Sequence, residues 1–253
     1  MVAAILQCNL VYKLYLIDNS PTNDLGVLAG NDKVEYIFNN KNLGYGAGHN
    51  IALRKAVNDD SLYHVVINPD IYFEEGTLEA IFDYMQQHTG VGQLMPRTVY
   101  PDGQLQYTCR LLPTPADLIV RRFLPGVFFK KRTQRFEMHN GYNTIMEAPY
   151  MLGCFMFLRV SAVKQVGYFD ERFFMYPEDI DLTRRMHRQY KTIYLPTVTI
   201  VHKHERGSYK SLKLLWVHVV NMVRYFNKWG WFNDKERAEV NNKIEAQFKA
   251  NSK

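Results

Sequence analysis

Hydrophobic and polar residues alternate in blocks along the first hundred residues of the chain. Short apolar runs that end in turn-forming residues predict buried strands at residues 13–17, 34–38, 64–67 and 91–95. Apolar residues at helical spacing predict helices at residues 49–57 and 77–88. Alternating strands and helices are typical of parallel βαβ units, so the pattern predicts an α/β fold with a mostly parallel twisted sheet flanked by helices.

The second half of the chain has a less regular pattern. Residues 148–158 predict a strand or a buried loop, and two short strands are expected at residues 193–195 and 198–201. Apolar positions from residue 210 to 229 recur every three or four residues, which predicts an amphipathic helix. The residues from Asp234 onward predict a polar helix or a frayed end.

The charge of the chain is concentrated near its C-terminal end. The net charge is +6, and residues 203–253 hold 11 basic and 5 acidic side chains, so the remainder is neutral. A basic segment beside a neutral domain favours an anionic neighbour, either nucleic acid or the cytoplasmic face of a membrane. We expect a domain at residues 1–205 and a basic amphipathic helical tail at residues 206–253.

The composition is that of a globular domain, with 47% hydrophobic and 22% charged residues. No apolar run reaches the roughly 18 residues needed to span a bilayer. The three cysteines are widely spaced and match neither a zinc pattern nor a disulfide scaffold. We therefore expect a cytoplasmic protein, with the inner face of the cell membrane as a candidate peripheral site.

The densest chemical motif lies at residues 167–185. An aromatic run at residues 173–176 precedes three carboxylates, which are Glu178, Asp179 and Asp181. Acidic residues favour the positive end of a helix dipole, so an ordinary helix start is one interpretation. Apolar walls also raise the pKa of a carboxylate and can tune it as a general base, which is the other interpretation.

Three further polar clusters follow predicted strands, where ligands bind in open α/β sheets. They are Asp18-Asn19-Ser20, the glycine-rich stretch from Asn42 to Asn50, and Asn68-Pro69-Asp70. Each has a structural alternative, because Asp, Asn and Gly are common in turns that end strands. A glycine-rich loop before a helix is by itself a weak indication of phosphate binding.

Taken in their order along the chain, these motifs resemble those of family 2 glycosyltransferases, especially the bacterial rhamnosyltransferase-like branch, over roughly residues 10–230. The resemblance implies a GT-A-like fold and an inverting transfer of a sugar from a nucleoside-diphosphate donor. The candidate donor is dTDP-rhamnose or a similar nucleotide sugar, and the acceptor is a saccharide or a lipid-linked glycan. Asp179 is the expected catalytic base, Glu178 orients the site or binds the acceptor, and Asp181 caps the helix.

The resemblance also assigns binding residues. Donor-binding roles fall on Asp18, Asn19, Asn42, Gly44, Asn50 and Asn68. A divalent cation, Mg²⁺ or Mn²⁺, is expected at Asp70, with His202 ahead of His204 as the histidine that approaches the metal or the diphosphate. A structural histidine is the alternative for that position. The expected acceptor-side residues are Gly153, Cys154 and Tyr176, of which Gly153 allows close backbone approach.

The N-terminal region departs from the family pattern. The family begins with a strand that ends in Thr-Tyr-Asn and a helix, whereas twelve residues precede Lys13. We expect an exposed edge on the strand that ends at Asp18, partly covered by residues 2–6, and a full enzyme that starts some 20–30 residues earlier. This chain is then expected to bind donor weakly, to be marginally stable, and to turn over slowly or not at all.

Two other functions stand beside the enzyme. A catalytically inactive remnant that binds glycan or membrane is the main alternative, because the family's first strand is absent from this sequence. We expect no nucleic-acid partner, because the basic residues fall on a helix with apolar stripes and no nucleic-acid motif appears.

Overall fold

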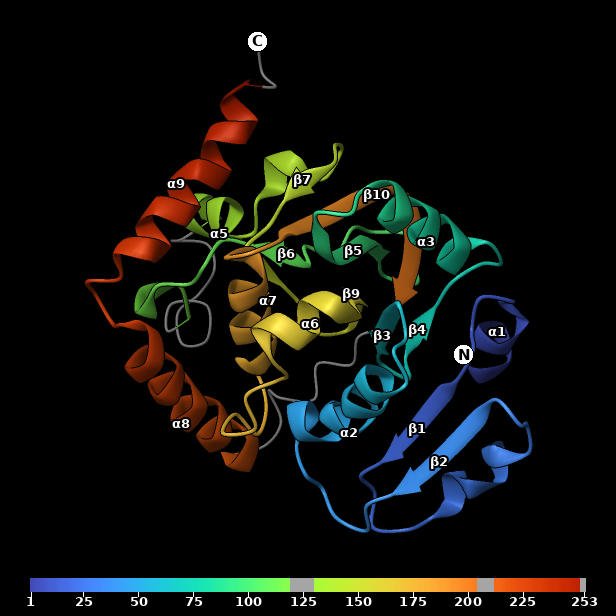
Figure 1. The fold of residues 1–253 in the computed structure, drawn as a ribbon. Coiled ribbons are helices and arrows are strands. Elements are labelled where there is room, and N and C mark those ends of the chain that lie inside the picture. The colour runs from blue at the N-terminus through green and yellow to red at the C-terminus, as the bar shows by residue number, and fades with distance from the viewer. Residues whose placement is uncertain (119–129, 204–211, 251–253) are drawn as a thin grey trace.

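The computed structural model describes residues 1–118, 130–203 and 212–250. A six-stranded sheet lies at its centre, in the order β3-β9-β5-β10-β4, with β7 paired to β10 (Figure 1). The strands are β3 (Tyr63–Ile67), β4 (Ile71–Tyr72), β5 (Val91–Val99), β7 (Met146–Glu147), β9 (Phe155–Arg159) and β10 (Lys191–His202). The α/β class is therefore confirmed.

The sheet is mixed, whereas the alternating pattern predicts a mostly parallel one. β5 and β10 are parallel, but β9 runs antiparallel to β3 and β5, and β4 and β7 run antiparallel to β10. An apolar run shows that a strand is buried and says nothing about its direction. The two strands expected at residues 193–195 and 198–201 form one strand, β10, whose register against β5 shifts between Leu195 and Thr199.

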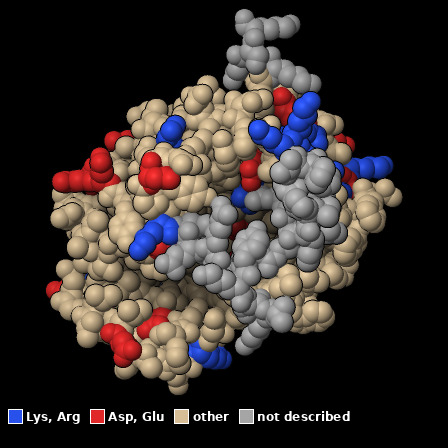
Figure 2. Space-filling model, turned by 180° about the vertical axis from the view of Figure 1, so that it is seen from behind, with Lys and Arg blue, Asp and Glu red and all other residues tan. Residues whose placement is uncertain are grey.

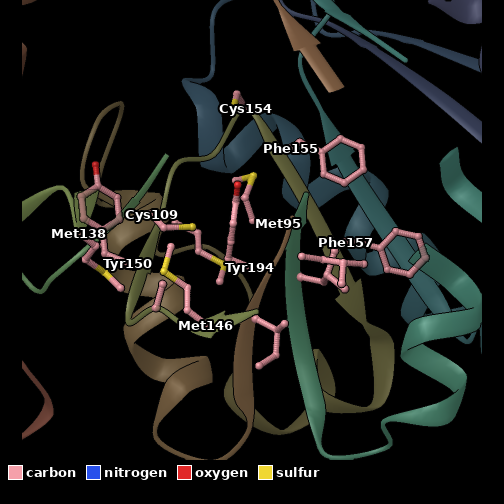
Figure 3. Packing of buried hydrophobic residues seen from close by; sticks show 14 of the residues in the cluster. Met95, Cys109, Met138, Met146, Tyr150, Cys154, Phe155, Phe157 and Tyr194 are labelled. Carbon is pink, nitrogen blue, oxygen red and sulfur yellow. The ribbon is translucent and has the colours of Figure 1, made fainter. Parts of the chain in front are cut away.

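The core occupies both faces of this sheet, and β9 shows the division. Phe155 and Phe157 join the larger cluster, which also holds residues of α3 (Thr77–Gln87), and both side chains are visible in Figure 3. Met156 and Leu158 join a second cluster with Leu53. Successive strand residues point to opposite faces, so this continuous apolar run reflects burial on both sides.

The second face is covered by α2 (Tyr45–Asn58), α6 (Val160–Val166) and α7 (Glu178–His187), which all contribute to that second cluster. The predicted helices at residues 49–57 and 77–88 are confirmed as α2 and α3. α2 begins earlier than expected because Gly44 precedes it with φ of +89°, a conformation that glycine adopts without a Cβ clash.

A separate two-stranded parallel sheet is formed by β1 (Leu14–Asp18) and β2 (Val34–Phe38), joined through the short helix η1 (Asp24–Ala29). α1 (Val2–Gln7) packs on this unit, where Ile5, Leu14 and Val34 form a small buried cluster. Within the described ranges β1 pairs with β2 alone. Residues 2–6 therefore pack on side chains of this unit, and the second edge of β1 has no strand partner among the described residues.

The middle of the chain forms short elements around the larger cluster. β6 (Cys109–Arg110) pairs with β8 (Tyr150–Met151), next to α5 (Lys130–Phe136) and η3 (His139–Gly141). Cys109 lies near Tyr150 and Met138 in the packed interior shown in Figure 3. Two-residue strands carry no periodic signal, which is why the sequence pattern does not reveal them.

Two helices close the structure, α8 (Leu212–Trp229) and α9 (Lys235–Ala250), and they run along one side of the molecule in Figure 1. Tyr225 and Phe226 of α8 and Ile244 of α9 are buried in the larger cluster. A helix is thus confirmed for both segments, and the division at residue 205 stays a prediction. None of the described helices is both long enough and apolar enough to cross a membrane.

An ion pair joins these closing helices to α7. Arg184 contacts both carboxylate oxygens of Asp234, at 2.7 and 2.8 Å, and the two side chains are 2% and 3% exposed. Its guanidinium also donates to Glu236 at 2.6 Å and lies 4.1 Å from the ring centroid of Trp229. Buried charges are tolerated when they are paired in this way.

We predict that Asp234→Ala lowers the free energy of unfolding by about 3 kcal/mol, because it leaves a buried guanidinium short of one partner. Urea unfolding measures this. Asp60→Ala is the matched control, since Asp60 also pairs with a cation, Lys164, but at an exposed position. Equal losses in the two variants would show that the buried pair does not hold α9 to α7.

Candidate active site

The two carboxylates of the central motif lie at the start of α7. Pro177 is the N-cap, and Glu178 and Asp179 are the first two helical residues, 4% and 7% exposed. One Asp179 oxygen accepts from the backbone N–H of Gly153 at 2.9 Å, and the other accepts from its neighbour Ile180 at 2.7 Å. The carboxylate is therefore held in a fixed orientation.

Burial sets the protonation of this pair. It raises the pKa of Glu178 well above its ordinary value, and the charge of Asp179 adds to the effect. Burial raises the pKa of Asp179 to about 7, although the N–H groups of Gly153 and Ile180 favour the ionised form. Glu178 also has a buried oxygen, Oε2, without a hydrogen-bond partner. Glu178 therefore holds its proton more tightly than an ordinary glutamate, and Asp179 titrates near pH 7.

Asp181, expected to cap the helix, does something else. It is fully buried and accepts from Arg185 at 2.8 Å, from Trp229 Nε1 at 2.8 Å and from Lys228 at 2.5 Å. These partners lie four residues along α7 and on α8. Asp181 therefore ties two helices together.

Gly153 brings the acceptor-side turn close to the carboxylates. A Cβ added at this position would lie 3.2 Å from the Tyr45 ring and 3.3 Å from Asp179 Cβ. Its carbonyl accepts a hydrogen bond from the Tyr45 hydroxyl. Tyr45 is a contact that the sequence analysis did not single out, although it lies inside the glycine-rich stretch.

Cys154 connects this turn to the third polar cluster. Its carbonyl accepts from the backbone N–H of Asn68 at 3.0 Å. Burial raises the pKa of the Cys154 thiol to about 12, and the charges of Asp179 and Asp70 add to the effect. The charges of the expected base, Asp179, and of the expected metal ligand, Asp70, therefore act on the same thiol.

Asp70 and His202 lie together, as expected for the two candidate metal ligands. Asp70 Oδ2 is 3.4 Å from His202 Nε2, and β4 places them there by pairing Ile71 with His202. The other His202 ring nitrogen lies 2.9 Å from Gln106 Oε1, and Gln106 donates to the His202 carbonyl. His204 lies outside the described residues.

These two side chains fit a divalent cation in one specific respect. Asp70 Oδ1 is buried and has no hydrogen-bond partner, as a metal-binding oxygen requires. One carboxylate and one imidazole suit Mn²⁺ better than Mg²⁺, which prefers oxygen ligands. In the described part of the chain no three His, Cys, Asp or Glu side chains cluster around a common point.

The glycine-rich loop contacts the acceptor-side segment directly. Asn42 Oδ1 accepts from the Gly44 N–H at 2.9 Å, which shapes the turn before α2. A Cβ on Gly44 would lie 2.4 Å from the Phe174 carbonyl oxygen, and the Tyr45 N–H donates to that oxygen at 2.9 Å. The predicted donor loop therefore packs against the aromatic run that leads to Glu178.

Asp18 and Asn19 lie on the other side of this loop. Asp18 is 3% exposed and accepts from Ser20 and from the Tyr36 hydroxyl, and these hydrogen bonds lower its pKa. The Asn19 amide nitrogen lies 3.5 Å from the Gly44 carbonyl, and its oxygen accepts from Asn39. Tyr36 is a partner that sequence spacing could not indicate.

Two other expected residues have contacts of their own. Asn50 is fully buried, donates to Phe169 and Glu171, and accepts from the Phe169 N–H, so it holds that turn in the structure. Tyr176 has φ of +94°, and its ring meets His218 edge-on at 4.7 Å. Donor contact for Asn50 and acceptor contact for Tyr176 stay predictions.

Two similar proteins are rhamnosyltransferases by name. N-acetylglucosaminyl-diphospho-decaprenol L-rhamnosyltransferase of Mycobacterium tuberculosis is 28% identical over 174 residues, covering 64% of this chain and 56% of that protein. Rhamnosyltransferase WbbL of Escherichia coli is 27% identical over 192 residues, covering 72% and 69%. The chain spans slightly more than half the length of the mycobacterial relative.

Solved structures share the fold at low sequence identity. GalNAc-T7 with UDP, GalNAc and Mn²⁺ matches with a TM-score of 0.61 and 13% identity, over 89% of this chain and 43% of that chain. The mannosyltransferase PcManGT of Pyrobaculum calidifontis, in complex with GDP-Man and Mn²⁺, matches with a TM-score of 0.53 and 15% identity, over 85% and 54%. The fold is thus that of GT-A glycosyltransferases.

A family model supplies the assignment. The model described as Glycosyl transferase family 2 matches residues 2–167, which is more than half of the chain. The match ends at Gly167, before Glu178 and Asp179. The roles expected of those two residues therefore depend on the geometry described above. This chain belongs to glycosyl transferase family 2.

Proposed function

We propose that the chain is an inverting glycosyltransferase that moves a sugar from a nucleoside-diphosphate donor to a hydroxyl of a saccharide or lipid-linked glycan. The observation that carries the proposal is the buried Asp179 carboxylate, which is held by two backbone N–H groups. The Asp70–His202 pair supports it as a candidate metal site. Rhamnose, from dTDP-rhamnose or a similar donor, is the candidate sugar because two relatives are named rhamnosyltransferases.

In the proposed reaction Asp179 accepts the proton of the acceptor hydroxyl. The hydroxyl oxygen then bonds to the anomeric carbon of the donor sugar, while the bond to the diphosphate breaks on the opposite face. Configuration at that carbon is inverted by this single displacement. Glu178 lies at the same helix end, where its raised pKa favours the protonated form that can donate a hydrogen bond to the acceptor.

Asp70 and His202 are the residues that would hold a divalent cation. When bound, such a cation neutralises charge that develops on the departing diphosphate. Asn68 follows the same strand end and offers an amide to the donor. The Asp18 and Asn19 pair lies across the glycine-rich loop, where Asn42 and Gly44 shape the proposed donor site.

We predict that nucleotide binding depends on a divalent cation through Asp70. Calorimetry with UDP and dTDP, with Mn²⁺ or with EDTA, measures this. Chelation or Asp70→Ala is expected to weaken binding at least tenfold, because phosphate oxygens lose their shared cation. Asp32→Ala, at an exposed acidic position, is the control. Equal affinity with Mn²⁺ and EDTA would rule out the metal.

We predict that Asp179→Asn lowers the transfer rate about 10²- to 10⁴-fold and leaves donor affinity nearly unchanged, because an amide cannot accept the proton. Glu178→Gln, which resembles the neutral acid, is expected to keep most activity. The roles are reversed if Glu178→Gln is inactive and Asp179→Asn is near normal.

The same assignment predicts the pH dependence. Only ionised Asp179 can act as a base, so kcat/KM is expected to rise with pH and level off above the pKa of about 7. Initial rates across pH 5.5–9 in a Mn²⁺-containing buffer measure this profile. A rate that falls as pH rises through 7 would contradict the assignment.

We also propose peripheral contact with an anionic membrane surface on the cytoplasmic side, where a lipid-linked acceptor would be presented. Trp216 and Val223, two turns apart on α8, are 69% and 40% exposed. Basic and acidic side chains are interspersed on the face shown in Figure 2, and Lys228 of α8 is engaged by Asp170 and Asp181. The membrane proposal thus depends mainly on the exposed apolar residues Trp216 and Val223.

We predict that Trp216→Ser reduces co-sedimentation with anionic vesicles at low salt, because an amphipathic helix binds a bilayer through its apolar face. Tyr12→Ser is the matched control, since Tyr12 is an exposed aromatic residue outside α8. Absence of vesicle binding by the unmodified chain would favour a soluble acceptor.

A further inference from the structure

The turn that leads into α7 contains an unfavourable backbone conformation. Tyr176 has φ of +94°, a region that residues with a Cβ rarely adopt. Tyr176 lies two residues before Glu178 and three before Asp179, and only the N-cap Pro177 separates it from α7. Such a conformation persists when surrounding contacts enforce it, and it is common at functional sites.

Several side chains of α8 contact this turn, in addition to the Tyr45 N–H that donates to the Phe174 carbonyl. Asn221, which is 1% exposed, donates from Nδ2 to the Met175 carbonyl at 3.0 Å. The ring of His218, one turn earlier on α8, meets the Tyr176 ring edge-on at 4.7 Å. Arg224 donates to the Arg172 carbonyl at 2.7 Å and to Asn221 Oδ1 at 3.1 Å. Side chains of α8 therefore contact this segment at Arg172, Met175 and Tyr176.

The same helix also fixes both ends of this segment. Lys228 bridges Asp170, before the turn, and Asp181, in the first turn of α7, at 2.8 and 2.5 Å. Trp229 donates to Asp181 at 2.8 Å. Asp181 lies two residues after Asp179, so the segment that carries the carboxylates is held by α8 on either side.

We propose that α8 positions the catalytic carboxylate: Asn221, supported by His218, holds the Met175–Tyr176 turn in its strained conformation and thereby sets the orientation of Asp179 toward the acceptor. The inference rests on the proposed function, and it assigns Asn221 as a positioning residue. Without its hydrogen bond the turn relaxes toward negative φ. That rotates the start of α7 and breaks the hydrogen bond between Gly153 and Asp179.

The first test compares Asn221→Ala with Asn227→Ala. Asn227 is the control because it lies on the same helix and its side chain bonds to Trp231, away from the turn. Asn221→Ala is expected to lower kcat on the order of ten- to a hundredfold, as misplaced catalytic groups do. Donor affinity stays within about twofold in both variants. An unchanged kcat in Asn221→Ala would overturn the proposal.

A double-mutant cycle separates positioning from general stability. Glycine adopts positive φ without strain, so in a Tyr176→Gly background the turn no longer needs Asn221 to hold it. Asn221→Ala is then expected to cost less than about threefold in kcat, against about tenfold or more in a Tyr176→Ala background. Equal costs in the two backgrounds would overturn the proposal.

Hydrogen exchange provides a readout that does not depend on glycosyl transfer. Amides of residues 173–180 are expected to exchange faster in Asn221→Ala than in Asn227→Ala, with the rest of α7 unchanged. If the chain transfers no sugar but this difference is seen, the proposed function fails and the positioning contact stands. If exchange is the same in both variants, the positioning contact itself is wrong.

Discussion

The site depends on the backbone of one residue, Gly153. Its N–H donates to the Asp179 carboxylate, and its carbonyl accepts from the Tyr45 hydroxyl, so one residue joins α7 to the start of α2. A Cβ would lie 3.2 Å from Tyr45 and 3.3 Å from Asp179, so a side chain at this position would require one of these two residues to shift. The proposed donor and acceptor sides therefore meet at a glycine.

Hydrogen bonds and burial shift the pKa values of the buried carboxylates in opposite directions. Asp18 keeps a low pKa because Ser20 and Tyr36 donate to it, whereas burial raises the pKa of Glu178 and Asp179. Of these two adjacent acids, Asp179 is the proposed base, because two backbone N–H groups hold its carboxylate. Holding them in apolar surroundings requires rigid support, which the buried Arg184–Asp234 pair and α8 provide.

Local patterns predicted much of this arrangement and left out what depends on distant contacts. Apolar runs placed β1, β2 and β3, and helical spacing placed α2 and α3, because each signal lies within its own element. Strand direction has no such signal, so the reversal of β9 was missed. The sequence motif predicts Asn50 as a donor-binding residue. Its side chain is hydrogen-bonded to the backbone of Phe169, 119 residues later, and no sequence pattern indicates such a contact. The strain at Tyr176 is likewise invisible in a sequence of residue types.

The most direct test of glycosyl transfer at this site is release of nucleoside diphosphate from a panel of nucleotide sugars, measured with Mn²⁺, Mg²⁺ or EDTA and with candidate glycan acceptors. We expect that at least one donor, with dTDP-rhamnose the first to try, is cleaved in the presence of a divalent cation and is left intact with EDTA. A chain that folds, binds nucleotide and still cleaves no donor under any of these conditions would contradict this expectation.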